Sequence, residues 1–382
     1  MIPVARPWMD EREADAARRA ILSGWVTQGP EVAAFEREFA AAVGAGHACA
    51  VSSCTTALHL ALLSLGVGAG DEVLTVSHSF IATANAVRYC GATPVLVDIE
   101  LATFNVDPAL VEAAISPRTK AILAVHQLGM PCDLAALVSI ARRRGVPLVE
   151  DAACGIGSEI NWHGQWERIG KPHGDIACFS FHPRKLLSTG DGGMLTTQNP
   201  KLDRAFRLLR QHGMSVPDAV RHASDRVIFE EYPVVGYNYR MTDIQAAIGR
   251  EQLLRLPAVV ARRRELAARY GARLQSIDGV IVPREPSWAR TNWQSYAVRV
   301  GAWIDQRTVM QRMLDAGIAT RRGAMNIHRE ASYPPDAWRA GSTLALGEEA
   351  QDTAIVLPLY HQLTEEDQDR VIKTLAAVIA SM

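Results

Sequence analysis

Residues 175–193 constrain the fold of this chain most strongly, and they read Asp-Ile-Ala-Cys-Phe-Ser-Phe-His-Pro-Arg-Lys-Leu-Leu-Ser-Thr-Gly-Asp-Gly-Gly. The first part, residues 176–181, is a short apolar and aromatic run that only Ser180 interrupts, which is typical of a buried strand. Lys185 follows just beyond this strand, and a glycine-rich turn comes after it. A lysine in this position can hold its amine against a carbonyl group, although a surface lysine after a strand would give the same local pattern.

The composition of the 382-residue chain limits the classes of protein that it can be. Its length suggests about two domains, and no apolar run approaches the roughly 20 residues that span a bilayer. The formal net charge of −1 gives no electrostatic argument for binding nucleic acid or an acidic membrane. Six scattered cysteines without a Cys-x-x-Cys pair favour a reduced, cytoplasmic protein with no metal site and no disulfide framework. The polar N-terminal segment, with Pro3 and Pro7, resembles neither a signal peptide nor a transit peptide.

From residue 48 onward, predicted strands alternate with predicted helices. The strands are expected at residues 48–51, 72–76, 94–98, 121–125, 147–150, 176–181 and 194–197. The helices between them are expected at residues 55–65, 81–89, 108–114 and 134–143. Apolar strands that alternate with amphipathic helices predict an α/β fold, with a mostly parallel seven-stranded sheet that helices cover on both faces.

The second part of the chain has a different pattern. A helix at residues 242–256 and an arginine-rich helix at 257–274 lead away from the predicted sheet. Beyond them come a strand at 296–300, a helix at 305–316, a short strand at 355–357 and a helix at 365–379. We therefore predict a large domain over residues 1–256 and a smaller C-terminal α+β domain, including the connecting helix, over residues 257–382.

Polar and aromatic side chains follow four of the predicted strands, at the carboxyl ends where ligands of parallel sheets bind. Ser53 opens a helix whose N–H groups could cradle a phosphate, although most such helix starts are only caps. Phe80 could stack on a flat ring or belong to the core. Asp151 could keep a pyridinium nitrogen protonated or be a solvated loop acid. Because Ser180 and Lys185 follow a neighbouring strand, our hypothesis is that Lys185 forms a Schiff base with pyridoxal phosphate (PLP).

Two glycine-rich segments could suggest nucleotide binding instead. Residues 66–70 precede a strand, whereas a dinucleotide fingerprint follows one, so we interpret them as a turn. Residues 190–193 lack the Gly-Lys-Ser/Thr ending of a nucleotide-binding P-loop. They predict a turn that lets the backbone run close to a ligand.

Six blocks of sequence together resemble the sugar aminotransferase family, within the fold-type I, aspartate aminotransferase-like PLP enzymes. They are Ser-Cys-Thr-Thr-Ala-Leu-His at 53–59, Ser-Phe-Ile-Ala-Thr at 79–83, Glu-Asp-Ala-Ala at 150–153, Phe-Ser-Phe-His-Pro-Arg-Lys at 179–185, Thr-Gly-Asp-Gly-Gly at 189–193 and Gly-Tyr-Asn-Tyr-Arg-Met-Thr-Asp at 236–243. The resemblance covers nearly the whole chain, and the fourth and sixth blocks are its most specific part.

The resemblance implies a role for individual residues. By similarity, Lys185 is the Schiff-base lysine and the general base and acid, Asp151 holds the pyridine nitrogen and Phe80 stacks on the ring. The phosphate would be held by Cys54, Thr55 and Ser180. Asn238 would reach the phosphate bound by the other subunit, which implies a homodimer with shared active sites. Arg321 and His328 match the part of the family's small domain that borders the sugar.

The activity that the resemblance implies is transfer of an amino group from glutamate to a nucleotide-linked keto-sugar. A 4-keto-sugar, as in perosamine synthase-like members, is favoured, and an aminocyclitol is an alternative substrate. A PLP-dependent sugar dehydratase is a further alternative, but Lys185 argues against it because histidine replaces the lysine in such enzymes. A non-catalytic regulator that binds PLP or a sugar nucleotide is the alternative from another class.

Two positions beside the expected cofactor depart from the family pattern. Many members have glutamine or histidine at the position of Cys154, where the side chain contacts the ring hydroxyl, and cysteine is a poorer hydrogen-bonding partner. Many members also have glycine at the position of Cys54. We also expect a lowered pKa for the amine of Lys185, because a proton-transferring lysine must be partly neutral near pH 7.

Overall fold

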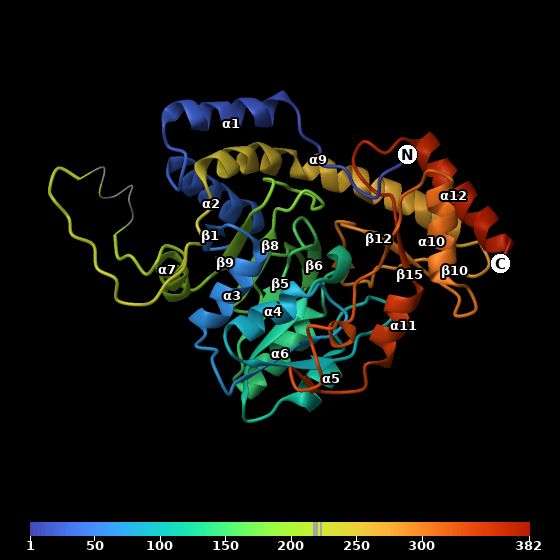
Figure 1. Cartoon of the computed structure of the whole chain (residues 1–382), viewed down its shortest axis with the longest axis horizontal. Helices are drawn as coiled ribbons and strands as arrows, with labels where there is room; N and C mark the ends of the chain where they lie inside the picture. Colours follow the sequence, from blue (N-terminus) through green and yellow to red (C-terminus); the bar gives the residue numbers. More distant parts are fainter. Residues whose placement is uncertain (217–220, 222–223) are drawn as a thin grey trace.

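An eight-stranded sheet forms the centre of the protein (Figure 1), in a computed structural model that describes residues 1–216, 221 and 224–382. Its strands are β1 (His47–Val51), β2 (Glu72–Val76), β3 (Thr93–Val97), β4 (Thr119–Val125), β5 (Leu148–Asp151), β8 (Ile176–Ser180), β9 (Gly193–Thr197) and β14 (Arg339–Ala340). The order is β1-β9-β8-β5-β4-β2-β3-β14, and β9 runs in the direction opposite to that of the other seven strands. The predicted mostly parallel α/β sheet is confirmed, but it has eight strands and not seven, because the two-residue β14 pairs with β3 at its edge.

Neighbouring residues of these strands belong to different cores, because successive side chains point to opposite faces. In β2, Val73 packs into one cluster and Leu74 into the other. One face is covered by α3 (Cys54–Ser64), α4 (Ala82–Tyr89) and α7 (Pro200–Leu209), and the other by α2 (Pro30–Val43), α5 (Pro108–Ala114), α6 (Leu134–Arg144) and the first half of α9 (Asp243–Leu274). Burial on both faces explains why the strands have continuous apolar sequences.

A single 32-residue helix, α9, replaces the two helices predicted at residues 242–256 and 257–274. Proline usually ends a helix, because it lacks the N–H group of the helical hydrogen bond. Here Pro257 is tolerated inside α9, since residues on both sides of it are held by tertiary packing. Leu256 and Val260 pack into the core of the large sheet, whereas Tyr270 and Leu274 pack into a second core.

The second core belongs to a four-stranded sheet made of β10 (Val280–Ile281), β12 (Tyr296–Val300), β15 (Ala354–Leu357) and β13 (Arg321–Arg322), in that order. The surrounding helices are α10 (Gln306–Asp315), α11 (Ala345–Thr353) and α12 (Glu365–Ala380). Ile2 is buried in this core and forms a parallel bridge with Ile318. The N-terminal residues therefore pack with the C-terminal part, and the division of the chain at residue 256 into two domains stays a prediction.

A separate sheet of three short strands was not predicted, because none of its strands has a continuous apolar run in the sequence. The strands are β6 (Glu159–Trp162), β7 (Gln165–Arg168) and β11 (Ala289–Arg290). The first two form a hairpin whose two-residue turn, His163-Gly164, has positive φ at both positions, 50° and 88°. Such a turn matches the twist of the paired strands. α1 (Glu11–Ser23) packs along the first half of α9.

None of the helices among the described residues combines the length and apolar character that a bilayer crossing requires. All six cysteines are free. The cytoplasmic location that the sequence favours stays a prediction.

Candidate active site

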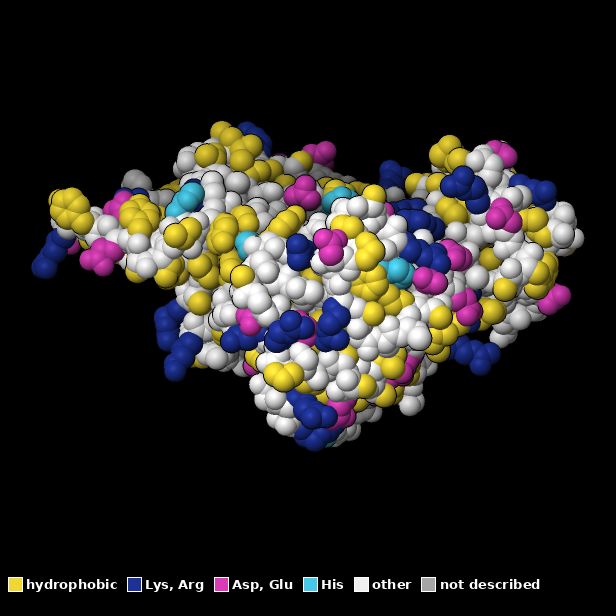
Figure 2. Space-filling model, turned by 60° about the horizontal axis from the view of Figure 1, so that its bottom comes forward, with side chains coloured by type: hydrophobic (Ala, Val, Ile, Leu, Met, Phe, Trp, Pro, Cys, Tyr) yellow, Lys and Arg dark blue, Asp and Glu magenta, His cyan; other side chains and the backbone are white. Residues whose placement is uncertain are grey.

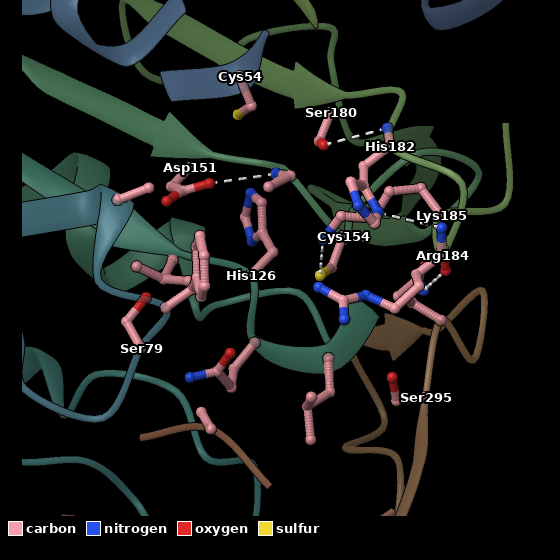
Figure 3. A pocket seen from close by; sticks show the side chains of 18 of the residues that line it. Cys54, Ser79, His126, Asp151, Cys154, Ser180, His182, Arg184, Lys185 and Ser295 are labelled. Carbon is pink, nitrogen blue, oxygen red and sulfur yellow. Dashed lines mark hydrogen bonds between the residues drawn. The ribbon is translucent and has the colours of Figure 1, made fainter. Parts of the chain in front are cut away.

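A pocket of about 480 Å³ lies at the carboxyl ends of the parallel strands (Figure 3). The large sheet supplies most of its wall. The small sheet contributes Arg321 and Arg322 from β13 and Val356 and Leu357 from β15. Six of the residues predicted to bind the cofactor line this pocket: Cys54, Thr55, Phe80, Asp151, Ser180 and Lys185. The strand-end argument therefore located the pocket, while the individual cofactor contacts stay predictions.

Lys185 stands in the turn that follows β8, where its backbone N–H donates to the carbonyl of His182 at 2.8 Å. Its Nζ donates a hydrogen bond to Cys154 Sγ at 3.0 Å (Figure 3). The expected lowering of the lysine pKa is wrong for this structure. Burial acts to lower the pKa of Lys185, but the sulfur atoms of Cys154 and Cys54, together with Asp151, outweigh it and raise the pKa above its ordinary value.

Asp151 ends β5 and is buried, so the alternative of a solvated loop acid is excluded. Its two carboxylate oxygens accept hydrogen bonds from Thr83 Oγ1 at 2.8 Å and from the N–H of Ala153 at 3.2 Å. Burial raises the pKa of Asp151, because these two hydrogen bonds and the distant charge of Lys185 offset the loss of solvent only in part. A protonated ring nitrogen would supply the cation that this carboxylate lacks.

The N-terminus of α3 presents unused backbone donors to the same pocket. Ser53 caps the helix: its Oγ accepts from the N–H of Thr56 at 3.2 Å, and its carbonyl accepts from the N–H of Ala57 at 3.1 Å. The N–H groups of Cys54 and Thr55 precede the first helical hydrogen bond and remain available to a ligand. A helix N-terminus with free N–H groups and a positive dipole end favours an anion such as a phosphate.

Gly193, the first residue of β9, allows the close approach on which this cradle depends. A Cβ atom at this position would lie 2.5 Å from the carbonyl carbon and oxygen of Ser53 and 2.7 Å from the nitrogen of Cys54. The glycine-rich turn at residues 190–193 thus lets the backbone of β9 run beside the start of α3.

Phe80 is 65% exposed and lines the pocket, so it is not a residue of the core. Exposure of a large aromatic side chain to a pocket is what a stacking position requires.

His126 is a pocket residue that sequence analysis missed. It follows β4, one of the strand ends that was not considered, and its ring is fully buried. Nδ1 accepts from the N–H of Cys132 at 3.0 Å, and Nε2 lies 3.1 Å from Glu150 Oε2. Since Nδ1 accepts, the ring proton sits on Nε2 and points to Glu150. The orientation of the ring against the pocket is thereby fixed.

Arginine side chains border the pocket on the side of the small sheet. Arg321 and Arg184 both line it. Burial lowers the pKa of Arg321, and the positive charges of Arg184 and Arg322 lower it further. This border is cationic, and an anionic part of a ligand would relieve the repulsion.

Two predicted site residues do not line this pocket. His328 lies outside it, and both ring nitrogens have partners: Nδ1 is 2.6 Å from Ser77 Oγ and Nε2 is 2.9 Å from Glu348 Oε1. Asn238 is exposed and pairs through its backbone with Gln211, away from the pocket of its own chain. Their predicted roles stay predictions.

The residues present fit PLP at its phosphate, its aldehyde and its ring nitrogen. The α3 N-terminus matches the phosphate, Lys185 matches the aldehyde and Asp151 matches the ring nitrogen. When bound, PLP supplies an electron sink for the bonds around the reacting carbon.

Comparisons with known proteins agree with this fit. The model of the DegT/DnrJ/EryC1/StrS aminotransferase family matches residues 7–376. GDP-perosamine synthase of Caulobacter vibrioides is 40% identical over 99% of this chain and 98% of its own length. The aminotransferase TlmJ of Streptoalloteichus hindustanus has a TM-score of 0.91 and 36% identity, over 100% of this chain and 99% of that one.

The putative sugar aminotransferase Spr1654 of Streptococcus pneumoniae, in its PMP-form, has a TM-score of 0.92 and 27% identity, over 100% of both chains. Fold, pocket and sequence relatives agree on one assignment. The chain belongs to the DegT/DnrJ/EryC1/StrS family of sugar aminotransferases and is a PLP-dependent aminotransferase.

Proposed function

We propose that this enzyme moves an amino group from glutamate to a nucleotide-linked keto-sugar, with a 4-keto-sugar favoured. The observation that carries the proposal is a single pocket in which Lys185, Asp151 and the start of α3 meet a cationic border at Arg184 and Arg321. The similarity to a GDP-perosamine synthase over nearly the whole chain supports the 4-keto-sugar. Guanidinium groups at the border suit the phosphates of a sugar nucleotide.

The chain's own residues would divide the work as follows. Asp151 keeps the ring nitrogen protonated, the N–H groups of Cys54 and Thr55 hold the phosphate with Ser180, and Phe80 covers the ring. Lys185 Nζ would carry a proton from the amine-bearing carbon of the donor to the aldehyde carbon of the cofactor, and in the second half-reaction from that carbon to the carbonyl carbon of the keto-sugar.

We further propose that two chains form a homodimer with shared active sites. The support is an arm, residues 224–235 between α7 and α9, which projects from the body (Figure 1). Its side chains Val227, Phe229 and Val235 are 84%, 88% and 87% exposed. Figure 2 shows such hydrophobic side chains gathered at that end. An apolar arm of this kind is expected to be covered by a partner, and Asn238 follows it directly.

The proposal is tested by incubating the purified enzyme with PLP, glutamate and, one at a time, a keto-inositol and a panel of GDP-, UDP- and dTDP-linked keto-sugars. The expected result is the mass of an amino-sugar nucleotide together with 2-oxoglutarate. The Lys185→Ala variant is the control and should give neither. Amination of a keto-inositol in place of every sugar nucleotide would assign the aminocyclitol alternative, and no amination of any substrate would favour a non-catalytic regulator.

A further inference from the structure

The pocket holds a thiol and an amine in direct contact. Lys185 Nζ donates a hydrogen bond to Cys154 Sγ at 3.0 Å, and the two side chains come from the segments that follow β8 and β5 (Figure 3). Both residues line the pocket and are half-buried, so the pair is open to a small molecule that enters the pocket. Attachment of PLP uses the amine of Lys185. The contact with sulfur therefore belongs to the form of the enzyme in which this lysine is free.

Burial works against chemical reaction at the other five cysteines. It raises the pKa of each of their thiols, and they are Cys49, Cys54, Cys90, Cys132 and Cys178. A thiol with a raised pKa forms little thiolate, and the thiolate is the form that reacts. Beside Cys154, the ammonium group of Lys185 favours the thiolate instead. Cys154 is therefore the cysteine of this chain that is best suited to react with an oxidant.

One segment of the chain holds the backbone on both sides of this contact. Asn292 Nδ2 donates to the carbonyl oxygen of Cys154 at 2.8 Å. Two residues further on, Gln294 Nε2 donates to the carbonyl oxygen of Arg184, the neighbour of Lys185, at 2.6 Å. The two amides are also joined to each other, because the backbone N–H of Gln294 donates to Asn292 Oδ1 at 2.7 Å. The sulfur and the nitrogen are thus kept close together, as formation of a bond between them requires.

We propose that Cys154 and Lys185 form a redox modification site, at which a peroxide joins the sulfur and the amine through a reversible covalent S–N bond. The bond forms only while Lys185 carries no PLP, and it then blocks the attachment of PLP. A sulfenic acid without a partner is open to further, irreversible oxidation. The neighbouring amine stops the oxidation of Cys154 at a stage that thiols reverse. The inference concerns the cofactor-binding lysine and is independent of the sugar that the enzyme aminates.

The first step oxidises the sulfur, with hydrogen peroxide as the oxidant. The Cys154 thiolate attacks one peroxide oxygen and the O–O bond breaks, so that the sulfur loses two electrons and becomes a sulfenic acid. The leaving hydroxide takes a proton from the Lys185 ammonium and becomes water. Burial acts to lower the pKa of Lys185, but its neighbours, Cys154 first among them, raise it, so the free amine carries the proton that this step consumes.

The second step links the two side chains without further oxidation. Lys185 Nζ has lost a proton and now offers a lone pair, which attacks the sulfur of Cys154. The S–O bond breaks, and the leaving hydroxide takes a proton from the nitrogen to give a second water. A dithiol reverses the link: one of its thiolates attacks the sulfur, the amine leaves with a proton, and the second thiolate then displaces Cys154 as it closes a disulfide within the dithiol.

The test treats the full-length enzyme with hydrogen peroxide, once after removal of PLP and once loaded with PLP. Each sample is digested without a reducing agent and analysed by mass spectrometry. In the PLP-free sample, we expect the peptides of Cys154 and Lys185 as one linked species, lighter than their sum by two hydrogen atoms. The PLP-loaded sample should not contain it. Dithiothreitol should release both peptides and restore the attachment of PLP, which the absorbance of the bound cofactor measures.

Two variants serve as controls. Cys90→Ala removes a half-buried cysteine outside the pocket and should give the same linked species as the wild type. Cys154→Ala lacks the sulfur, so peroxide should no longer prevent the attachment of PLP to Lys185. The inference is overturned by a disulfide between Cys154 and another cysteine, by a linked species that retains an oxygen atom, or by the same link in the PLP-loaded sample. It is equally overturned if Cys154 stays unmodified or is oxidised while Lys185 remains free.

Discussion

Cys154, which contacts Lys185, is one of the two pocket residues that depart from the pattern that the family resemblance implies. The contact of Cys154 with Lys185, at 3.0 Å, joins the proposed catalytic amine to a sulfur atom, where many relatives are expected to have glutamine or histidine. Burial acts to lower the pKa of Lys185, and Cys154 contributes most to raising it. The contact with the cysteine therefore favours the charged form of the amine before the cofactor is attached.

Replacing Cys154 by alanine should lower the pKa of Lys185. A lower pKa means more neutral amine at a given pH, and only the neutral amine attacks a carbonyl. The rate at which PLP becomes attached to the cofactor-free enzyme should then rise at pH 7, and the pH profile of that rate should move to lower pH. Stopped-flow absorbance measures it, with Cys90→Ala as the matched control. A profile that stays in place or moves to higher pH would show that the sulfur does not act on the amine.

At the scale of elements, the cradle at the start of α3 depends on β9. Gly193→Ala would put a Cβ atom 2.5 Å from the Ser53 carbonyl, where backbone atoms cannot give way cheaply. We expect the Kd for PLP to rise at least ten-fold, because the displaced N–H groups of Cys54 and Thr55 no longer converge on the phosphate. Equilibrium dialysis measures it. Gly68→Ala is the control, since nothing lies within 4 Å of that Cβ position. Equal affinities in both variants would contradict the role of this close approach.

Glu36 of α2 joins this helix to β1 and to the end of α7. Its carboxylate accepts from Arg207 Nη1 at 2.7 Å and also pairs with Arg210, both near the end of α7, and it accepts from the N–H of Ala50 at 2.9 Å. Burial alone would raise the pKa of Glu36, but the two arginines outweigh it and the pKa is lowered. Removing one partner of a buried ion pair costs about 3–5 kcal/mol.

Glu36→Gln should therefore lower the free energy of unfolding by about 3–5 kcal/mol at pH 7. Because the folded state has the lower pKa, the contribution of the ionised Glu36 is present above the unfolded pKa of about 4.3 and is lost as the pH falls through the folded value. The difference between wild type and variant should shrink below about pH 4. Urea unfolding at several pH values measures it. A difference that is independent of pH would mean that packing, and not charge, is lost.

Sequence patterns predicted those elements whose pattern is continuous over several residues. The seven strands with apolar runs were confirmed, whereas β14 has two residues and no pattern of its own, since its pairing with β3 decides it. The hairpin of β6 and β7 was missed because its polar residues resemble a loop.

In the site, Asp151 and Phe80 were found at strand ends, but Gln294 reaches the pocket from 109 residues beyond Lys185. Only tertiary contacts place it there.

At the scale of the whole molecule, the pocket depends on parts of the chain that are far apart in the sequence. Both sheets line it, and α9 contributes to both cores. Asn238 does not reach the pocket of its own chain, so the proposed dimer would complete the site with a residue from the partner. Complementation between two defective chains tests this arrangement.

Co-expression of a Lys185→Ala chain and an Asn238→Ala chain with different tags allows the mixed dimer to be isolated. In a shared arrangement, one of its two sites combines both substitutions and the other combines neither. The mixed dimer should then show about half of the wild-type kcat. Each variant homodimer should have lost at least ten-fold in kcat, the Lys185→Ala enzyme because it lacks the catalytic amine and the Asn238→Ala enzyme because it lacks a hydrogen bond to a charged phosphate. A mixed dimer no more active than the mean of the two variants would place each site within one chain.

The most direct test of the account is to find which lysine carries the cofactor. The enzyme is loaded with PLP, reduced with borohydride, digested and analysed by mass spectrometry. Lys185, in the pocket with Asp151 and the start of α3, is predicted to carry the pyridoxyl group. Lys171, which is half-buried, lies outside the pocket and is paired with Glu167, is predicted to stay unmodified. A pyridoxyl group on another lysine, or on none, would contradict the central claim.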